Sequence, residues 1–253
     1  MQEPLISVIT ICYNAELCIE RTLRSVSEQT YKHIEYIIID GASTDGTLTL
    51  VTQLAPTAEV LSDPDRGIYD AMNKGLARAS GDYVWFMNAG DAFYSAQTVA
   101  QLVEAVRQRG ECPDIIYGDT MLIDSEGREL GLRRLRPPQH LSADSFRAGM
   151  LVCHQAFVCR RSLAPRYDLR YRYSADVDWC IRAMQGAKTY LFISSPIACY
   201  LREGATTRHR FASLRERFDV MRRHYGLVPT LLRYLFFALR LIAQKLFRAT
   251  SSL

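Results

Sequence analysis

Short, continuously apolar runs divide the first 110 residues, and each is followed by a segment whose apolar positions have helical spacing. Because their hydrophobic residues do not alternate with polar ones, the runs predict strands that are buried on both faces of a sheet. The four repeats predict an α/β fold with a Rossmann-like, mostly parallel sheet flanked by helices. The predicted strands are residues 5–12, 34–39, 60–62 and 83–87, and the predicted helices are residues 14–29 (with Asn14 as N-cap), 47–54, 68–79 and 98–107.

The second half has a less regular pattern. One helix is predicted there, and its first turn contains Asp176 and Asp178, where carboxylates suit the helix dipole. The expected elements are a strand at residues 114–123, a loop at 133–140, a buried strand or loop at 149–159, a helix at 175–185, and strands at 189–194 and 197–201.

Polar side chains gather where the predicted strands end. Open α/β sheets bind ligands in the crevice beyond the carboxyl ends of their strands, so these side chains are expected to converge on one cleft. Two of them also have simpler explanations: Asp40 would bond nearby backbone N–H groups in a turn, and Asp91 would belong to a plain strand-end turn. The residues concerned are Asn14, Asp40, Asp45, Asp65, Arg66 and Asp91.

Two common nucleotide-binding signatures are absent from the sequence. No G-x-G-x-x-G follows the first strand and no G-x-x-x-x-G-K-[ST] occurs, which argues against nicotinamide-dependent Rossmann enzymes and P-loop nucleoside triphosphatases. Without a glycine-rich turn, the backbone cannot approach a diphosphate closely. A divalent cation held by carboxylate is the usual alternative, and Asp91 stands at the floor of the expected cleft, where such a ligand is needed.

Charge is distributed unevenly within an ordinary globular composition of 48% hydrophobic and 23% charged residues. Residues 208–253 contain ten Lys or Arg and two acids, a net charge of +8, whereas the rest of the chain sums to −4. Such a tail indicates an anionic partner, which is either a membrane surface or nucleic acid. Its lipid-like apolar content argues against nucleic acid.

The apolar part of the tail, residues 228–247, contains Arg233 and Arg240 seven residues apart, on one helical face. The uncharged run between them has six residues, whereas a helix needs about 20 apolar residues to span a bilayer. We therefore expect an amphipathic helix that lies in the membrane interface, with its arginines toward anionic headgroups. The alternative is a helix packed on the protein's own core or on a second copy.

The cysteines and the N-terminus indicate the compartment. Seven cysteines occur without a C-x-x-C pair, which favours a reducing environment. The N-terminus has no basic region followed by an apolar one, so no signal peptide is expected. Together with the tail, these features predict a cytoplasmic protein that is peripherally associated with the inner face of the cell membrane.

Five segments together resemble the family 2 glycosyltransferases, which have the GT-A fold. The resemblance follows the family's order over roughly residues 5–200. It is closest to a branch that makes bacterial surface polysaccharides, in which Asn-x-Gly-Asp replaces the usual Asp-x-Asp. The matching segments are residues 6–14 (ISVITICYN), 35–47 (EYIIIDGASTDGT), 65–75 (DRGIYDAMNKG), 79–91 (ASGDYVWFMNAGD) and 174–179 (SADVDW).

The resemblance implies a donor site in the first half of the chain. Thr10, Tyr13 and Asn14 would line the nucleoside pocket, and Asp40 would hydrogen-bond the base with Asp45 beside it. The residues that would face the donor's phosphates or sugar are Arg66, Lys74 and Asn88.

The resemblance also implies the catalytic groups. Asp91 matches the aspartate that binds Mn²⁺ or Mg²⁺, although Asn88 and Gly90 stand where the family usually has further carboxylates. Asp176 matches the catalytic base. The helix that follows the base would carry Asp178, Trp179 and Arg182. Asp178 and Trp179 are candidates for the acceptor site or for a loop beside it.

Several of these assignments have alternatives. Asp176 would otherwise be a partner of the helix dipole, and Asp178 should point elsewhere because it lies two residues further along the helix. His154 and Gln155 would either contact the acceptor or metal, or His154 would be a hydrogen-bonded core residue. Residues 202–207 would form a loop that closes over the diphosphate, or a linker.

The resemblance therefore implies an inverting, metal-dependent glycosyltransferase that transfers a sugar from a nucleotide-sugar, with UDP the expected nucleotide. The acceptor would be a hydroxyl of a glycan or of a polyprenol-linked molecule. The expected division is a nucleotide-sugar-binding half at residues 1–110, an acceptor and catalytic-base half at 111–207, and a basic amphipathic tail at 208–253. The alternatives are a sugar nucleotidyltransferase and a non-catalytic nucleotide-sugar-binding protein.

Overall fold

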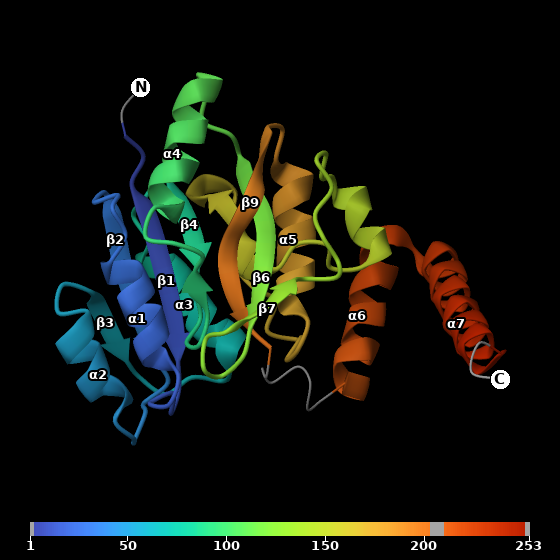
Figure 1. Ribbon diagram of the computed structural model, residues 1–253, viewed down its shortest axis with the longest axis horizontal. Coiled ribbons are helices and arrows are strands. Elements are labelled where there is room, and N and C mark those ends of the chain that lie inside the picture. Colours follow the sequence, from blue (N-terminus) through green and yellow to red (C-terminus); the bar gives the residue numbers. More distant parts are fainter. Residues whose placement is uncertain (1–2, 203–209, 251–253) are drawn as a thin grey trace.

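The computed structural model describes residues 3–202 and 210–250 of the chain. Its centre is a mixed sheet with helices on both faces, and two further helices extend from one side (Figure 1). Within the described residues the sheet has nine strands, in the order β3-β2-β1-β4-β8-β6-β9-β5, with β7 paired to β6 off this path. The predicted α/β class with a mostly parallel sheet is confirmed.

The amino-terminal half of the chain forms a parallel set of strands. β1 (Ile6–Cys12) pairs with β2 (Ile34–Asp40) and with β4 (Tyr83–Phe86), and β2 pairs with β3 (Glu59–Ser62). Every residue of β1 and β4 is buried, as their unbroken apolar sequences predict. The carboxyl ends of these strands therefore lie along one edge of the sheet.

The other half of the sheet mixes directions. β8 (Phe157–Arg160) is antiparallel to β4 and to β6 (Ile115–Ile123), whereas β6 is parallel to β9 (Tyr190–Leu201). β7 (Glu129–Leu132) forms a hairpin with β6, and β5 (Ala92–Phe93) pairs with the end of β9. β5 lies at the outer edge of the sheet, beyond β9. The chain therefore passes from the middle of the sheet to this edge immediately after β4.

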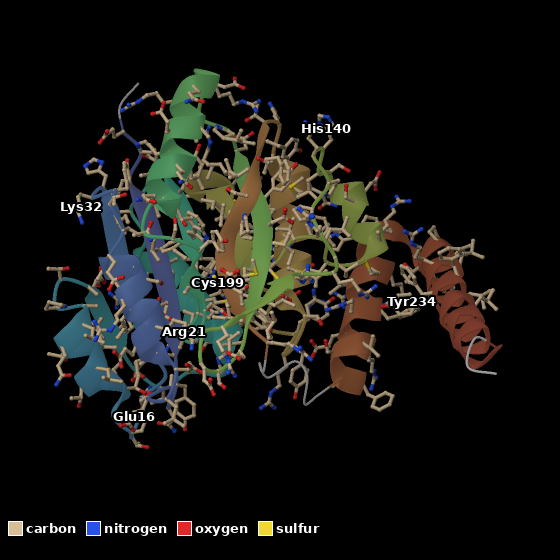
Figure 2. All side chains as sticks on the ribbon, viewed as in Figure 1. Glu16, Arg21, Lys32, His140, Cys199 and Tyr234 are labelled. Carbon is tan, nitrogen blue, oxygen red and sulfur yellow. The ribbon has the colours of Figure 1, made fainter. Side chains whose placement is uncertain are left out.

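Helices cover both faces of the sheet, and side chains fill the space between the layers (Figures 1 and 2). One face carries α1 (Ile19–Ser27), α2 (Thr47–Leu54) and α4 (Thr98–Arg109), and the other carries α3 (Ile68–Arg78) and α5 (Ala175–Gly186). Short 3₁₀ helices occur in the connections; they are η1 (Ala143–Ala148), η2 (His154–Ala156) and η3 (Arg161–Leu163).

The tail consists of α6 (Arg210–Tyr225) and α7 (Leu227–Thr250). Val220 and Met221 of α6 are buried in the core that contains α5, and α7 packs on α6 through Tyr234, which is labelled in Figure 2. Among the described residues, no helix is both long and apolar enough to cross a bilayer. The apolar side chains of α7 that are more than half exposed include Val228, Leu232, Leu235, Phe236 and Leu239.

The first helix begins at Ile19, five residues later than predicted, and Cys18 rather than Asn14 precedes it. Asn14 instead has a left-handed φ of 44°, which asparagine tolerates better than most residues. Its Oδ1 accepts a hydrogen bond from the Thr44 N–H (2.9 Å), and its own N–H donates to Ser43 Oγ (2.8 Å). Asn14 therefore joins the loops that follow β1 and β2 and does not cap a helix.

Two predicted features in the second half also differ from the structure. The strands expected at residues 189–194 and 197–201 are one strand, β9, because register shifts against Asp119 of β6 accommodate Pro196. Residues 149–159 are neither a strand nor a loop throughout, since η2 and then β8 form within them.

Candidate active site

A cavity of about 370 Å³ lies at the carboxyl end of β4, between the start of α3, the start of α5 and α6. Asp91 and Asp176 both line it, although they come from different halves of the chain. The cavity is also lined by Asn88, His154 and Gln155. Of the six residues expected to converge at the strand ends, Asp91 lines this cavity, whereas Asn14, Asp40, Asp45, Asp65 and Arg66 do not.

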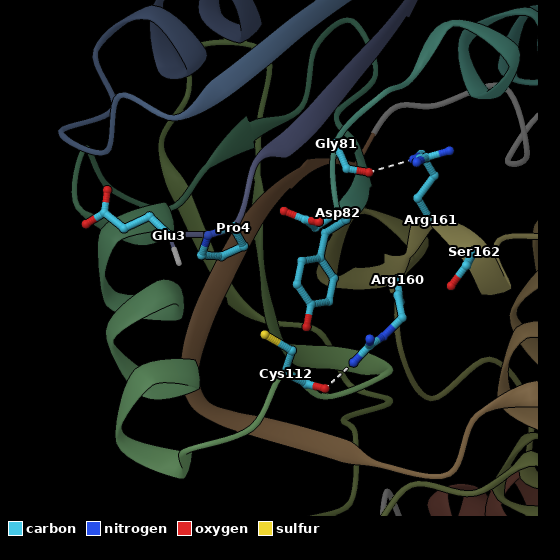
Figure 3. Close-up of a pocket in the computed structure, with 9 residues that line it drawn as sticks. Glu3, Pro4, Gly81, Asp82, Cys112, Arg160, Arg161 and Ser162 are labelled. Carbon is cyan, nitrogen blue, oxygen red and sulfur yellow. Dashed lines mark hydrogen bonds between the residues drawn. The ribbon is translucent and has the colours of Figure 1, made fainter. Parts of the chain in front are cut away.

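A second cavity, of about 390 Å³, lies at the opposite end of β4 (Figure 3). The two arginines that line it already have partners within the protein. Arg161 donates to the carbonyl of Gly81 (2.7 Å), and Arg160 donates to the carbonyl of Cys112 and pairs with Asp114. Because these groups already have internal partners, we place the active site in the first cavity.

Asp91 is almost completely buried at the floor of the cavity. Its Oδ1 accepts a hydrogen bond from the Leu201 N–H (3.0 Å), and its Oδ2 accepts one from Gln155 Nε2 (2.6 Å). Burial raises the pKa of Asp91 to about 7, although both hydrogen bonds and the charge of Arg21 act to lower it. A cation bound here would therefore be held by a carboxylate that is largely shielded from water.

The turn that presents Asp91 is built from local sequence and from α1. Gly90 has a φ of 96°, and a Cβ at this position would come within 2.9 Å of Leu201, so a larger residue would be strained. Thr22 of α1 accepts a hydrogen bond from the Gly90 N–H (2.9 Å) and donates to the carbonyl of Asp91 (2.6 Å). The turn is thus held from outside as well as by its own backbone.

Asn88 and His154 form a polar pair beside Asp91. Asn88 Nδ2 lies 3.0 Å from His154 Nε2, which places the amide N–H toward an acceptor nitrogen. Burial lowers the pKa of His154, against the opposing charge of Asp176, so the ring is neutral at pH 7. Asn88 Oδ1 is buried on the cavity wall with no hydrogen-bond partner among the described residues. An unsatisfied buried oxygen is costly, so this atom indicates a ligand.

Asp176 lies in the first turn of α5 and faces the same cavity, with 22% of its side chain exposed. Its Oδ1 accepts a hydrogen bond from the Tyr69 hydroxyl (3.2 Å), and its Oδ2 is 3.8 Å from His154 Nδ1. The carboxylate is therefore oriented by two side chains from separate elements but stays accessible. It can receive a proton from a molecule in the cavity.

The segment before α5 is held by α6, a contact that the sequence analysis missed. Glu216 Oε1 accepts a hydrogen bond from the Arg172 N–H (2.9 Å). Its Oε2 accepts two more, from the N–H groups of Tyr173 (2.7 Å) and Ser174 (3.0 Å). One carboxylate thus receives three consecutive backbone N–H groups immediately before Asp176. A signal was present, since Glu216 is one of two acids in a strongly basic tail.

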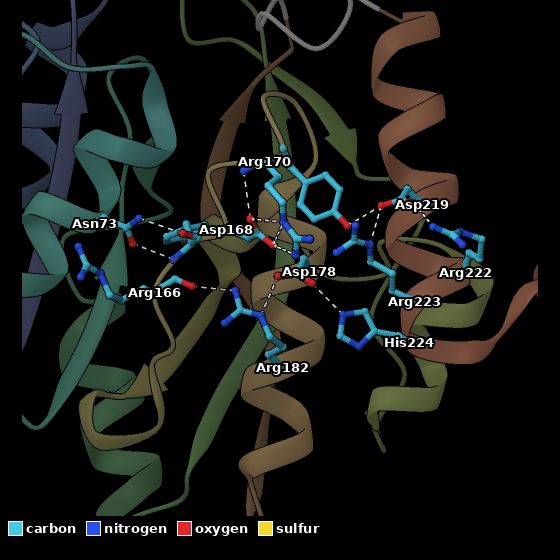
Figure 4. A network of polar contacts seen from close by, with 12 residues as sticks. Asn73, Arg166, Asp168, Arg170, Asp178, Arg182, Asp219, Arg222, Arg223 and His224 are labelled. Carbon is cyan, nitrogen blue, oxygen red and sulfur yellow. Dashed lines mark hydrogen bonds and ion pairs between the residues drawn. The ribbon is translucent and has the colours of Figure 1, made fainter.

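Asp178 and Trp179 do not line the cavity, which corrects their predicted acceptor role. Asp178 Oδ1 lies 2.8 Å from His224 Nε2 of α6, and its Oδ2 accepts a hydrogen bond from Arg182 Nε (2.7 Å; Figure 4). Burial alone would raise the pKa of Asp178, but the hydrogen bonds from these two partners keep it below its ordinary value. Trp179 is fully buried and donates to the carbonyl of Pro165 (2.6 Å), so both residues fix α5 in place.

The predicted nucleoside residues lie in two layers. Tyr13 is 64% exposed, and Asn14 lies beside it at the surface. A Cβ on Gly41 would come within 3.2 Å of Tyr13 and 2.7 Å of Asp65 Oδ2, so the absence of a side chain at Gly41 lets these two groups approach each other. Tyr13, Asn14 and Asp65 therefore form the accessible part of this region.

Thr10 and Asp40 lie beneath that layer and are fully buried. Thr10 Oγ1 donates to the carbonyl of Met87 (2.8 Å), and Asp40 accepts hydrogen bonds from the Ser43 N–H (2.9 Å) and Ser62 Oγ (2.7 Å). Neither side chain is presented to a ligand, which corrects their predicted roles. Asp40 forms the turn contacts of the simpler explanation.

Asp45, Arg66 and Lys74 also have protein partners. Asp45 accepts hydrogen bonds from the N–H groups of Thr47 (3.0 Å) and Glu16 (3.1 Å), and the hydrogen bonds from Thr47 lower its pKa. Its contacts hold the start of α2. Arg66 is largely exposed and pairs with a carboxylate one turn along α3.

Lys74 does not line the cavity, and its side chain is bonded to the loop after β3. Its Nζ donates to Asp63 Oδ2 (3.0 Å) and to the carbonyl of Pro64 (2.8 Å). The loop after β3 turns back toward α3, so it accepts three hydrogen bonds from Lys74 Nζ. The predicted loop at residues 202–207 lies, apart from Arg202, outside the described residues.

The residues of the cavity fit a divalent cation that is completed by substrate. Among the described residues, no cluster of three His, Cys, Asp or Glu side chains is arranged to enclose a metal. Asp91 and Asn88, whose Oδ1 has no partner, instead both line the cavity and have hard oxygen atoms that could bind a cation. Mg²⁺ and similar ions are commonly held by one or two carboxylates together with water and substrate phosphates.

Comparison with known proteins gives relatives that are glycosyltransferases. An uncharacterized glycosyltransferase of Mycobacterium tuberculosis is 37% identical over 237 residues, which cover 87% of this chain and 86% of the relative. The amylovoran biosynthesis glycosyltransferase AmsB of Erwinia amylovora is 30% identical over 213 residues, which cover 79% of this chain and 70% of the relative.

Two solved structures share the fold. S. aureus TarS 1–349 in complex with UDP-GlcNAc matches with a TM-score of 0.67 and 19% identity, over 86% of this chain and 64% of that chain. The mannosyltransferase PcManGT of Pyrobaculum calidifontis, in complex with GDP-Man and Mn²⁺, matches with a TM-score of 0.62 and 18% identity, over 90% of this chain and 67% of that chain. At these identities the comparison concerns the fold.

The sequence model of glycosyl transferase family 2 matches residues 7–166, which is more than half of the chain. This span contains the parallel strands, the turn with Asp91 and the pair of Asn88 and His154. The fold, the cavity at the strand ends and the relatives agree with that match. The chain therefore belongs to glycosyl transferase family 2.

Proposed function

We propose that this glycosyltransferase transfers a sugar from a nucleotide-sugar, with UDP as the nucleotide, to a hydroxyl of a glycan or lipid-linked acceptor, with inversion at the anomeric carbon. The process would be the synthesis of a bacterial surface polysaccharide. The observation that carries the proposal is that Asp91 and Asp176 line one cavity. One carboxylate is buried and suited to a cation, and the other is accessible and suited to a proton.

The donor would lie along the strand ends, with its nucleoside over Tyr13, Asn14 and Asp65 and its diphosphate near Asn88 and Asp91. A divalent cation, Mn²⁺ or Mg²⁺, would be held by Asp91 and Asn88 Oδ1 and would neutralise charge on the leaving nucleoside diphosphate. The ligands named for the two structures of the same fold, UDP-GlcNAc in one and GDP-Man with Mn²⁺ in the other, support a nucleotide-sugar donor and a divalent cation.

Asp176 would act as the base. Its side chain lines the cavity, and the Tyr69 hydroxyl fixes its Oδ1. As the acceptor oxygen attacks the anomeric carbon, its proton passes to the Asp176 carboxylate and the bond to the nucleoside diphosphate breaks. A single displacement with one base inverts the configuration. Neutral His154 supports this role, since it adds no competing positive charge beside the carboxylate.

The chemistry predicts that donor binding depends on a cation and on Asp91. Wild-type protein should bind UDP-GlcNAc at least about tenfold more tightly with Mn²⁺ than after EDTA treatment, because Asp91 contributes a buried ligand charge. Asp91→Asn should lose most of this difference in isothermal titration calorimetry. Asp82→Asn, which changes a carboxylate in the cavity of Figure 3, is the control and should behave as wild type. Failure to bind any of UDP-, GDP- or dTDP-sugars with Mn²⁺ would argue against the proposed function.

We also propose that the tail docks on an anionic membrane surface, at the cytoplasmic face. The exposed apolar side chains of α7 would enter the interface, while the +8 charge of residues 208–253 attracts anionic headgroups. The proposed division of the chain follows from this: residues 1–110 bind the donor, 111–207 supply the base and acceptor contacts, and 208–253 connect the enzyme to the membrane.

Removing residues 227–253 should release the protein from vesicles that contain anionic lipid, because α7 carries the exposed apolar surface. The truncation keeps α6 and therefore keeps the contacts of Glu216 with the segment before α5. A second variant, Leu232→Glu with Leu235→Glu, tests the same surface in the full-length chain. Both should sediment poorly with vesicles at low salt compared with wild type. An unchanged bound fraction would count against membrane docking.

A further inference from the structure

One short turn, η2, contacts both of the residues that offer oxygen atoms to the proposed cation. His154 Nε2 lies 3.0 Å from Asn88 Nδ2, and Gln155 Nε2 donates to Asp91 Oδ2 (2.6 Å). The turn is itself fixed, because the indole N–H of Trp85 donates to the carbonyl of Gln155 (2.7 Å). Two adjacent side chains of η2 therefore hold the two candidate cation ligands.

The orientation of the Asn88 amide decides whether this residue can bind a cation. A neutral imidazole has one N–H donor and one acceptor nitrogen, and a side-chain amide has a donor NH₂ group and an acceptor oxygen. If His154 Nε2 is the acceptor, the NH₂ group of Asn88 must face it, and Oδ1 is then turned away from the ring. If Nε2 carried the proton, Oδ1 would turn toward the ring and would be lost to a cation.

The carboxylate of Asp176 favours one of these two tautomers of His154. Asp176 Oδ2 lies 3.8 Å from His154 Nδ1, the ring nitrogen that does not contact Asn88. A proton on Nδ1 is attracted by the carboxylate, whereas a lone pair on Nδ1 would face a negative charge. The form with its proton on Nδ1 is therefore favoured, and Nε2 remains the acceptor for the Asn88 amide.

The simpler explanation, that His154 is only a hydrogen-bonded core residue, does not account for its neighbour. It explains why 12% of the His154 side chain is exposed. It leaves Asn88 Oδ1 buried on the cavity wall with no hydrogen-bond partner among the described residues. A cation at Oδ1 would satisfy this atom, and side chains that orient a metal ligand typically change metal affinity by about 10- to 100-fold.

We propose that His154 is a positioning residue for the cation site: it holds the Asn88 amide so that Oδ1 faces the cation, and Asp176 keeps the ring in the tautomer that allows this. The inference rests on the proposed function and deepens it, because one side chain would connect the catalytic base to a cation ligand. It assigns His154 neither to the acceptor nor to direct contact with the cation.

The main test measures Mn²⁺ affinity in the full-length chain saturated with UDP, by isothermal titration calorimetry. His154→Leu removes the acceptor nitrogen and leaves the Asn88 amide free to rotate, so Mn²⁺ affinity should fall about 10- to 100-fold. His154→Gln can present its side-chain oxygen to Asn88 Nδ2 and should restore the affinity to within about threefold of wild type.

A double-mutant cycle shows whether His154 acts through Asn88. Asn88→Ala removes the proposed ligand oxygen and should also weaken Mn²⁺ binding. Adding His154→Leu to Asn88→Ala should then cause a further loss of less than about threefold. UDP affinity measured with EDTA should stay within about threefold of wild type in each variant, because no cation takes part in that binding.

His224→Leu is the matched control. The His224 side chain has the same exposed fraction as that of His154, 12%, and it also faces an aspartate of α5, Asp178. Neither His224 nor Asp178 lines the cavity. The control should lose some thermal stability and keep Mn²⁺ affinity within about threefold of wild type, and thermal unfolding verifies that every variant is folded.

The tautomer can be measured in the wild-type protein, without relying on the folding of any variant. The ¹⁵N chemical shifts of the His154 ring, assigned by their absence from His154→Gln, distinguish a proton on Nδ1 from one on Nε2. We expect the proton on Nδ1. A proton on Nε2 would overturn the inference, because Asn88 Oδ1 would then face the ring.

The binding data could also overturn the inference. Unchanged Mn²⁺ affinity in His154→Leu, or an equal fall in His224→Leu, would show that His154 has no specific part in cation binding. A further loss of more than about threefold in the double mutant would show that His154 acts independently of Asn88. Absence of Mn²⁺ binding by wild type with UDP would contradict the proposed function as well.

Discussion

Replacing Asp176 with asparagine is expected to lower the turnover number for sugar transfer by about 100- to 10,000-fold, the range that a positioned general base contributes. Asparagine keeps the size of the side chain and can keep the contact with the Tyr69 hydroxyl, but it cannot accept the acceptor's proton. Donor binding should change little, because the proposed donor contacts lie near Asn88 and Asp91. Release of UDP under saturating donor and acceptor measures the effect, and calorimetry with UDP-GlcNAc measures donor binding.

Asp178→Asn is the matched control for Asp176. It alters a carboxylate in the same helical turn, but one that contacts His224 and Arg182 outside the cavity. We expect some loss of thermal stability in this variant, with turnover per folded molecule within about tenfold of wild type. Near wild-type turnover in Asp176→Asn, or an equal loss in both variants, would show that Asp176 is not the base.

Glu216→Ala is expected to produce the second largest effect. The change removes the acceptor for three backbone N–H groups immediately before Asp176. Because hydrogen bonds to a charged group contribute about 1.5–3 kcal/mol each and water can replace part of this, we expect a loss of about 2–5 kcal/mol in the free energy of unfolding. The turnover number should fall about tenfold or more, since a displaced base loses its alignment with the acceptor.

Kinetic constants separate positioning from simple destabilisation. If Glu216 positions the base, the turnover number falls under conditions where the protein is folded, while the KM for the donor changes little. Glu216→Gln keeps one side-chain oxygen acceptor and should lie between alanine and wild type. Asp219→Asn is the control on the same helix, because Asp219 accepts from the Tyr171 side chain rather than from the backbone. Unchanged turnover per folded Glu216→Ala molecule would reduce the role of Glu216 to stability.

The parallel half of the fold follows closely from the sequence, because β1 and β4 are short and mainly apolar and every residue in them is buried. β1, β2, β3 and β4 begin and end within one residue of the predicted positions. The strand-end rule predicts a cleft beside Asp91, whereas the pairing of Asp91 with Asp176 was implied by the family resemblance. The predicted family was confirmed by the match over residues 7–166, which ends before the last of the five segments, residues 174–179.

The contacts that correct the prediction depend on tertiary structure. In the sequence, Lys74 looks like a residue that binds phosphate. In the structure, the loop after β3 turns back toward it, and its Nζ pairs with the carboxylate of Asp63. Asp40 looks like an exposed strand-end carboxylate until Ser43 and Ser62 are seen to enclose it. The role of Glu216 requires a contact across more than 40 residues, which no local pattern contains.

The family match and the proposed catalytic residues cover different parts of the chain. The match ends at residue 166, before Asp176 and before the whole of α6. The roles proposed for Asp176 and Glu216 therefore rest on where these side chains lie, since Asp176 lines the cavity and Glu216 accepts hydrogen bonds from the segment before it. The part of the chain after residue 166 also continues beyond the sheet and its flanking helices into the basic tail.

The most direct test of the central claim is a crystal structure of the Asp176→Asn protein with UDP-GlcNAc and Mn²⁺, with the metal located by its anomalous scattering. We expect one Mn²⁺ within about 2.5 Å of an Asp91 oxygen, with Asn88 Oδ1 and the donor diphosphate in its coordination sphere. The sugar should then project toward residue 176 in the same cavity. A donor complex with its metal and diphosphate away from Asp91, or with the sugar directed away from residue 176, would contradict the account.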